Sequence, residues 1–197
     1  MKLTSYIESL ILTLDAIPEE RKERLKLLFQ YIKLKREKNE AILLNFVCTH
    51  NSRRSQLAQI WAQTAADYYG IDCKTFSSGV EVTSFNARAV NAIETVGFKT
   101  IKGKGENPVY TIDNGFQSMS CFSKLIDDKT NPQSNFAAIM TCSHADENCP
   151  VVLGMEKRIA LNYEDPGVYD GTALEEKMYL ERSEQIAREM FYLFSKI

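Results

Sequence analysis

Residues 41–56 read AILLNFVCTHNSRRSQ, and the order of apolar, small polar and basic residues in this stretch decides the fold. The run AILLNFV is short, continuous and apolar, which is typical of a strand that is covered on both faces of a parallel sheet. Cys48 stands at the end of this run, and helical spacing of apolar residues begins near Ser55. We therefore expect a strand, a short loop and the N-terminus of a helix, in that order.

Further along the chain, strand-like and helical segments alternate. Helical spacing predicts helices over 55–69, 86–97 and the C-terminal stretch, in which Thr172 and Glu175 match a capping box of the form S/T-x-x-E. Apolar runs predict strands over 41–47, 72–79, 135–142 and 157–163, with a weaker candidate at 107–112. The remainder of 99–135 is rich in Gly, Asn, Asp and Lys, and we expect loops around one short helix there. Strands that alternate with helices indicate an α/β fold with a mainly parallel sheet.

The first 39 residues have a helical pattern that is not interrupted by strand-like runs. Leu25, Leu28, Phe29 and Ile32 fall on one face of a helix, and the surrounding stretch RKERLKLLFQYIKLKREK is locally basic. The basic residues indicate either the solvated outer face of a packed helix or an arm that binds a partner or an anion. We predict an N-terminal helical extension over 1–39 that packs on the main domain, and an α/β domain over 40–197.

Composition excludes several classes of protein. Apolar residues make up 44% of the 197 residues and charged residues 25%, and the net charge of −2 gives no case for nucleic-acid binding. No stretch approaches the ~18 apolar residues of a membrane span. The N-terminus does not resemble a signal peptide, so we expect a cytoplasmic protein with reduced thiols. The five cysteines are then catalytic, redox-active, metal-binding or simply buried, rather than a disulfide framework.

Cys48 to Ser55 form the pattern C-x5-R-S beyond the carboxyl end of a strand, where α/β sheets bind ligands. A short loop that leads into a helix N-terminus collects backbone N–H groups and binds tetrahedral oxyanions. The same field stabilises a thiolate, which makes Cys48 a nucleophile, while Arg54 offers its planar fork to the oxyanion and Ser55 donates to the sulfur. The alternative is a half-buried cysteine beside surface arginines. The predicted oxyanion-binding residues are Thr49, His50, Asn51, Ser52, Arg53 and Ser55.

Two more cysteines lie in residues 141–150, TCSHADENCP. Cys142 ends a predicted strand, so it is expected at the same edge of the sheet as Cys48. With Cys149 it suggests a disulfide relay, in which one thiol attacks a modified Cys48 and the other resolves the new disulfide. Alternatively, the two cysteines are inert, or they bind a metal together with His144 and Asp146, although that spacing is not a standard zinc pattern. For Cys73 and Cys121 we expect an inert, buried role.

Residues 161–167, LNYEDPG, follow the last predicted strand and reach the same edge of the sheet. Pro166 stiffens the turn and holds the preceding residue extended. A carboxylic acid here, Glu164 or Asp165, can protonate an oxygen that leaves a phosphorus or arsenic centre. The alternative is an ordinary turn with surface acids.

Taken together, FVCTHNSRRSQLAQIW (46–61), SSGVEV (77–82), TCSHADENCP (141–150) and YEDP (163–166) resemble the low-molecular-weight protein tyrosine phosphatase superfamily. The resemblance runs in order over about residues 41–170 and is closest to the thioredoxin-coupled arsenate reductases, because the phosphatases do not need the pair Cys142 and Cys149. It implies a three-layer α/β/α fold with a four-stranded parallel sheet.

The resemblance also implies a mechanism with no metal and no cofactor. Cys48 attacks arsenate held by Arg54 and the loop amides, and Asp165 protonates the departing oxygen. Cys142 then attacks the Cys48 sulfur as arsenite leaves, and Cys149 resolves that disulfide, leaving a Cys142–Cys149 disulfide for thioredoxin to reduce.

Two other functions remain open. In a phosphatase, water would hydrolyse a phosphorylated Cys48, with phosphomonoesters as substrates and phosphate or sulfate as ligands. A non-catalytic oxyanion- or redox-sensing module would signal through the N-terminal helices.

Two loop residues depart from the family pattern. The family usually has glycine at the position of His50, where glycine allows close approach of the backbone or a positive φ angle. It usually has cysteine at the position of Arg53, which here adds either positive field or a surface ion pair. We expect both departures to affect the shape or the charge of the loop.

Overall fold

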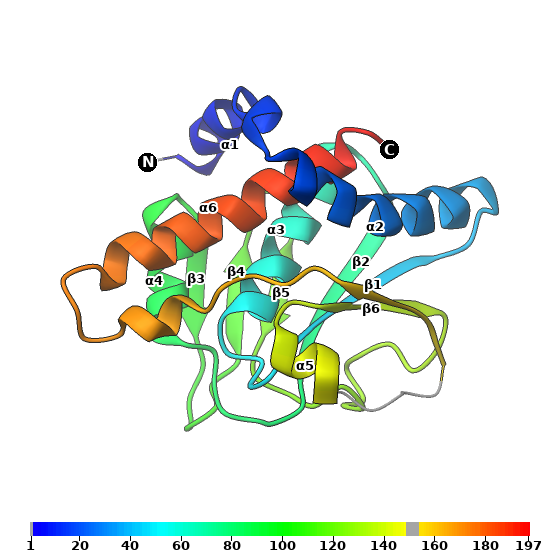
Figure 1. Cartoon of the computed structure of the whole chain (residues 1–197). Coiled ribbons are helices and arrows are strands. Elements are labelled where there is room, and N and C mark those ends of the chain that lie inside the picture. The colour runs from blue at the N-terminus through cyan, green and yellow to red at the C-terminus, as the bar shows by residue number, and fades with distance from the viewer. Residues whose placement is uncertain (1, 149–153) are drawn as a thin grey trace.

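A four-stranded parallel sheet with helices packed on it dominates the computed structural model, which describes residues 2–148 and 154–197 (Figure 1). The helical elements are α1 (Leu3–Ile11), η1 (Leu14–Ala16), α2 (Glu19–Glu37), α3 (Arg54–Tyr68), α4 (Ala87–Thr95), α5 (Ser143–Asn148), η2 (Pro166–Tyr169) and α6 (Glu175–Phe194). The strands are β1 (Ile42–Cys48), β2 (Cys73–Gly79), β3 (Lys99–Lys102), β4 (Tyr110–Asp113), β5 (Ser118–Cys121), β6 (Phe136–Met140) and β7 (Met155–Ala160). The predicted fold class is confirmed.

The parallel strands lie in the order β2-β1-β6-β7, so the chain moves outward in one direction from β1 to β2 and later returns to the other side of β1. The reversal falls between the carboxyl ends of β1 and β6. In open α/β sheets this switch point is where ligands bind. Cys48 is the last residue of β1, and Cys142 follows two residues after the end of β6. The topology therefore brings these two cysteines to one edge of the sheet.

Alternate side chains of the sheet pack into two separate cores, as the pleat of a strand requires. On β1 and β6, Leu44, Phe46, Ala137 and Ile139 belong to the larger core, which is shared with α3 and α6. Val47, Ala138 and Met140 belong to a smaller core on the other face, which also contains Cys48, Cys142 and Ala145. The two reactive-cysteine candidates thus sit at the margin of the smaller core.

The N-terminal helices pack along α6, and α2 also contacts β1 and β7 (Figure 1). The predicted apolar face of α2 is confirmed, because Leu25, Leu28 and Ile32 are buried in the larger core and Phe29 packs against it. The division of the chain into an extension over 1–39 and a domain over 40–197 stays a prediction. Among the described residues, no helix is long and apolar enough to cross a membrane.

Residues 99–135 differ from the prediction. They contain no helix, and β3, β4 and β5 form an additional antiparallel sheet. The expected strand at 107–112 corresponds to β4. The neighbouring strands β3 and β5 are four residues long and mostly exposed, so they lack the alternating apolar pattern that would mark them in the sequence.

The predicted capping box on α6 is wrong. The helix begins at Glu175 after Leu174, and no side chain caps it. The Thr172 hydroxyl donates to the Tyr169 carbonyl and accepts from the N–H of Leu174, and the Glu175 carboxylate accepts from the N–H of Gly171 and from Arg88. Both side chains therefore close the turn before the helix.

Candidate active site

The loop between β1 and α3 turns its carbonyl oxygens toward the surrounding protein. The four carbonyls of residues 49–52 all accept hydrogen bonds, from the N–H groups of Val80, Glu81 and Asn86 and from the side chains of Gln56, Thr83 and Ser123. By contrast, no N–H group of residues 49–54 donates to another residue in the described ranges. A run of backbone N–H groups without protein acceptors at a helix N-terminus is an anion-binding concavity.

Two backbone positions give this loop its shape. Asn51, with a φ angle of 47°, is the one described residue of the loop in the left-handed region, a conformation that asparagine tolerates better than most residues. Gly79 at the end of β2 lies against the loop, and a Cβ there would stand 2.7 Å from both the Asn51 nitrogen and the Thr49 oxygen. The sequence SSG is therefore part of the site because the loop needs the space that glycine leaves.

A chain of hydrogen bonds orients the Ser55 hydroxyl so that it can donate its proton to the Cys48 sulfur. The N–H of Lys124 donates to Asn51 Oδ1 at 3.0 Å, which fixes the amide so that Nδ2 donates to Ser55 Oγ at 2.8 Å. Ser55 Oγ lies 3.0 Å from Cys48 Sγ. Because Ser55 accepts from Asn51, its single proton is free to donate to the sulfur. The arrangement stabilises a thiolate, and it is buried: Cys48 is 4% exposed and Ser55 is 0% exposed.

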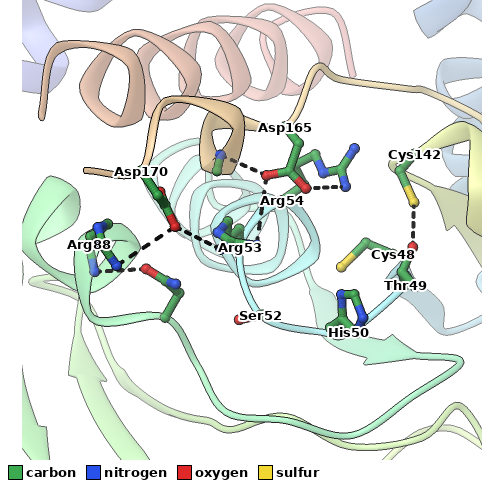
Figure 2. A network of polar contacts seen from close by, with 12 residues as sticks. Cys48, Thr49, His50, Ser52, Arg53, Arg54, Arg88, Cys142, Asp165 and Asp170 are labelled. Atoms are coloured by element: carbon green, nitrogen blue, oxygen red, sulfur yellow. Dashed lines mark hydrogen bonds and ion pairs between the residues drawn. The ribbon is translucent and has the colours of Figure 1, made fainter. Parts of the chain in front are cut away.

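Arg54 and Asp165 meet directly at the mouth of the loop. Arg54 Nη2 lies 2.6 Å from Asp165 Oδ2, and Arg54 Nη1 donates to the carbonyl of Tyr163 at 3.0 Å (Figure 2). Asp165 Oδ1 also accepts from the N–H of Gly167 at 2.9 Å, which holds the carboxylate at the start of η2. Arg54 Nε is buried and has no hydrogen-bond partner in the described part of the chain. One edge of the guanidinium therefore holds the Asp165 carboxylate, while the Nε–H group has no acceptor among the described residues.

Arg53 also approaches Asp165, with 3.9 Å between Arg53 Nη1 and Asp165 Oδ1, and it has further partners of its own (Figure 2). Its guanidinium donates to Tyr179 Oη at 2.7 Å and to Asp170 at 3.1 Å, and it packs under Gly167, where a Cβ would stand 2.7 Å from Arg53 Cζ. Tyr179 Oη donates in turn to Asp170 at 2.8 Å. Burial, followed by the hydrogen bond to Asp170, raises the pKa of Tyr179 to about 12, so it stays protonated. Two roles were predicted for Arg53, a source of positive field and an ion pair, and the contact with Asp170 supports the ion pair.

The other loop side chains are also engaged by the protein. Ser52 Oγ donates to the Ser84 carbonyl at 2.7 Å, and His50 Nε2 lies 3.1 Å from the Glu81 carboxylate at the exposed rim. His50 does not take the positive φ angle for which a glycine would be needed. The histidine thus causes no backbone strain, and the N–H groups of the loop, rather than these side chains, are the donors without a partner among the described residues.

Cys142 lies next to the loop, as predicted. Thr49 Oγ1 lies 3.5 Å from Cys142 Sγ and 3.3 Å from His144 Nδ1, and the N–H of Ala145 donates to the Cys142 sulfur at 3.4 Å (Figure 2). Cys149, the second residue of the predicted relay, lies outside the described residues. Within the described residues, no group of three or more His, Cys, Asp or Glu side chains could hold a metal ion.

Several residues of the site have no signal in the sequence. Tyr163 acts through its carbonyl, which no sequence pattern distinguishes, and Tyr179 and Asp170 contribute from the C-terminal helix and the turn before it. A pattern search for arginine partners near the Asp-Pro pair could have found Asp170. Gly79 had a signal, because a glycine within or at the end of a strand often marks the close approach of another backbone.

Comparison with known proteins places this chain among enzymes of related chemistry. No known family profile matches the chain. Arsenate reductase 2 of Staphylococcus saprophyticus is 32% identical over 121 residues, which cover 61% of this chain and 76% of that protein. The arsenate reductase of Bacillus subtilis is 29% identical over 140 residues, which cover 71% of this chain and 85% of that protein.

Several solved structures that are similar in fold are low-molecular-weight phosphatases. A low-molecular-weight phosphotyrosine phosphatase from Vibrio cholerae has a TM-score of 0.54 at 13% identity and covers 79% of this chain and 96% of its own. A low-molecular-weight protein tyrosine phosphatase from T. tengcongensis has a TM-score of 0.54 at 19% identity and covers 80% of this chain and 100% of its own. These relatives show that the chain belongs to the arsenate reductase family, and its fold is that of the low-molecular-weight protein tyrosine phosphatases.

Proposed function

We propose that this protein is an arsenate reductase in which Cys48 is the nucleophile and Cys142 and Cys149 form a disulfide relay. The observation that carries the proposal is the contact between Thr49, which directly follows Cys48, and the sulfur of Cys142, which comes from the neighbouring strand end. A phosphatase needs only the Cys48 loop. A second free thiol beside that loop supports a reaction in which two thiols supply two electrons.

The first step follows from the geometry of the loop. The N–H groups of residues 49–54 and Arg54 bind the arsenate oxygens, and the Cys48 thiolate, stabilised by Ser55, attacks arsenic. Asp165 protonates the oxygen that leaves as water. Arg54 begins this step hydrogen-bonded to Asp165. At least one of its N–H groups must therefore exchange the carboxylate for an oxygen of the oxyanion.

The second half of the reaction moves electrons from sulfur to arsenic. Cys142 attacks Cys48 Sγ, the sulfur–arsenic bond breaks, and the electron pair stays on arsenic, which leaves as arsenite. Cys149 then attacks Cys142 and releases Cys48 as a thiol. We propose thioredoxin as the reductant of the resulting Cys142–Cys149 disulfide, and the cytoplasm as the compartment in which such a relay returns to its reduced state.

The second candidate is phosphomonoester hydrolysis through a phosphorylated Cys48. It is favoured by Asp165, which pairs with Arg54 and would protonate the alcohol oxygen that leaves a phosphomonoester when Cys48 attacks phosphorus. In this case Cys142 and Cys149 would protect Cys48 from irreversible oxidation instead of completing a catalytic cycle.

Turnover of arsenate with thioredoxin, thioredoxin reductase and NADPH separates the two candidates. We expect steady turnover by the wild-type protein and loss of turnover in Cys142→Ser and Cys149→Ser, with hydrolysis of p-nitrophenyl phosphate retained in both variants. The phosphatase would instead be established if both variants hydrolyse p-nitrophenyl phosphate and the wild-type protein never reduces arsenate. A Cys48→Ser variant that retains both activities would contradict both candidates.

A further inference from the structure

The imidazole of His144 and the sulfur of Cys142 both lie within hydrogen-bond distance of the same hydroxyl group, that of Thr49. Thr49 Oγ1 lies 3.5 Å from Cys142 Sγ and 3.3 Å from His144 Nδ1, so one hydroxyl connects the two side chains. In Figure 2, Thr49 lies beside Cys48 and directly faces Cys142. Cys142 must lose its proton before it can attack Cys48, and Thr49 connects its sulfur to a group that can accept that proton.

The single proton of the Thr49 hydroxyl allows a proton to pass from Cys142 to His144. A threonine hydroxyl has one proton, so Thr49 can donate to one neighbour and must accept from the other. When Cys142 is a thiol, it donates to Thr49, and Thr49 donates to unprotonated His144 Nδ1. After the transfer, His144 Nδ1 donates to Thr49, and Thr49 donates to the Cys142 thiolate. Every group is hydrogen-bonded in both states without a change of rotamer.

The surroundings favour this route over direct loss of the proton to water. Cys142 is only 2% exposed, whereas His144 is exposed and can pass the proton to solvent. The N–H of Ala145 donates to the sulfur and stabilises the thiolate once it forms. Two charged residues on α5 and β7, Asp146 and Arg158, form an ion pair at 3.3 Å.

We propose that His144 is a positioning residue that accepts the Cys142 proton through Thr49 when Cys142 attacks Cys48. The proton of Cys142 Sγ moves to Thr49 Oγ1, and the proton of Thr49 moves to His144 Nδ1. The new thiolate forms the sulfur–sulfur bond with Cys48 while the bond from Cys48 to its leaving group breaks. The inference rests on the proposed function for the attack of Cys142 on Cys48 and for arsenite as the leaving group.

Hydrogen peroxide tests the proton transfer without arsenate. Peroxide converts Cys48 to a sulfenic acid, which Cys142 attacks to form the Cys48–Cys142 disulfide and water. Dimedone traps the same sulfenic acid, so the ratio of disulfide to dimedone adduct, measured by peptide mass spectrometry, reports the rate of attack by Cys142. A Cys149→Ser background stops the relay at this disulfide.

His144→Asn is the informative variant because the asparagine amide occupies the place of Nδ1 and keeps a hydrogen bond to Thr49 but cannot take up a proton. We expect the disulfide-to-adduct ratio to fall at least about tenfold in this variant. The exposed Glu147→Gln on the same helix is the control and should leave the ratio unchanged. Hydrolysis of p-nitrophenyl phosphate by His144→Asn should match the parent, since that reaction does not use Cys142.

Chemical rescue separates proton transfer from a structural role. In His144→Gly, we expect added imidazole to raise the ratio toward the parent value, which a merely structural contribution would not allow. Adding Thr49→Val to His144→Asn should cause little further loss, because both side chains act in one pathway.

An unchanged ratio in His144→Asn, an absence of rescue by imidazole, or a parent that forms no Cys48–Cys142 disulfide with peroxide would each overturn the inference. A failure of the proposed function looks different. In that case peroxide produces the disulfide in the parent and His144→Asn impairs it, but arsenate produces no disulfide at all.

Discussion

Replacing Arg21 by methionine tests how the N-terminal helices are joined to the segment that carries the acid. Arg21 on α2 forms two hydrogen bonds to the Glu189 carboxylate on α6, at 2.8 and 2.7 Å, and donates to the Asn162 carbonyl at 3.0 Å. Its guanidinium lies 4.9 Å from the centre of the Tyr163 ring. The carbonyl of Tyr163 in turn accepts from Arg54. The substitution therefore removes a contact between the first 39 residues and the base of the active site.

The size of the effect follows from burial. The side chain of Arg21 is 13% exposed and that of Glu189 is 2% exposed. Without Arg21, the Glu189 carboxylate stays in the interior, and its remaining donors among the described residues are the Tyr163 hydroxyl and the Gln185 amide. Breaking a buried pair by removing one partner costs about 3–5 kcal/mol, because the remaining charge is uncompensated. With a urea m value of about 2 kcal/mol/M, the midpoint of unfolding should fall by about 1.5–2.5 M.

Equilibrium urea unfolding, followed by far-UV circular dichroism, measures this shift. Arg24→Met is the matched control on the same helix, because its ion pair with Glu20 is exposed, at 45% and 73%, and contributes at most about 0.5 kcal/mol. Adding Glu189→Gln to Arg21→Met should recover most of the loss, since no buried charge remains. A loss below about 1 kcal/mol in Arg21→Met would refute the reasoning.

Three further predictions concern the loop and the cysteines. Ser55→Ala removes a hydrogen bond to the Cys48 thiolate worth about 1.5–3 kcal/mol, so kcat/KM for p-nitrophenyl phosphate should fall about 10- to 150-fold; a change under twofold would contradict the role of Ser55. Gly79→Ala pushes backbone atoms of the loop apart, so calorimetry should detect weaker phosphate and arsenate binding, and unchanged affinity would show that the loop tolerates a Cβ there. Burial raises the pKa of the Cys121 thiol to about 12 and that of Cys73 still further; at pH 8 both therefore stay protonated in the folded protein, and iodoacetamide should label Cys48 before either of them in peptide maps.

The sequence alone was sufficient for the parts of the fold that have a strong local pattern. The apolar run before Cys48 and the helical spacing after Ser55 predicted β1, the loop and α3, and the strand ends then predicted that Cys142 would come close to Cys48. Apolar periodicity reports burial directly, and the parallel topology follows from the alternation of strands and helices.

Features that depend on partners distant in the sequence could not be predicted. Arg53 could have been a source of positive field or part of an ion pair, and only the fold brings Asp170 and Tyr179 to its guanidinium. The capping box at Thr172 was wrong because the turn before α6 offered the same side chains other backbone partners. The exposed strands of the second sheet were missed because they are held by pairing with each other and not by an apolar pattern.

The most direct test of the relay is peptide mass spectrometry of the fully reduced protein after arsenate is added without any reductant. The account predicts one equivalent of arsenite and a disulfide between Cys142 and Cys149, with Cys48 recovered as a free thiol. In Cys149→Ser the disulfide should instead join Cys48 and Cys142. Arsenate that remains unreduced while all three cysteines stay free would contradict the account.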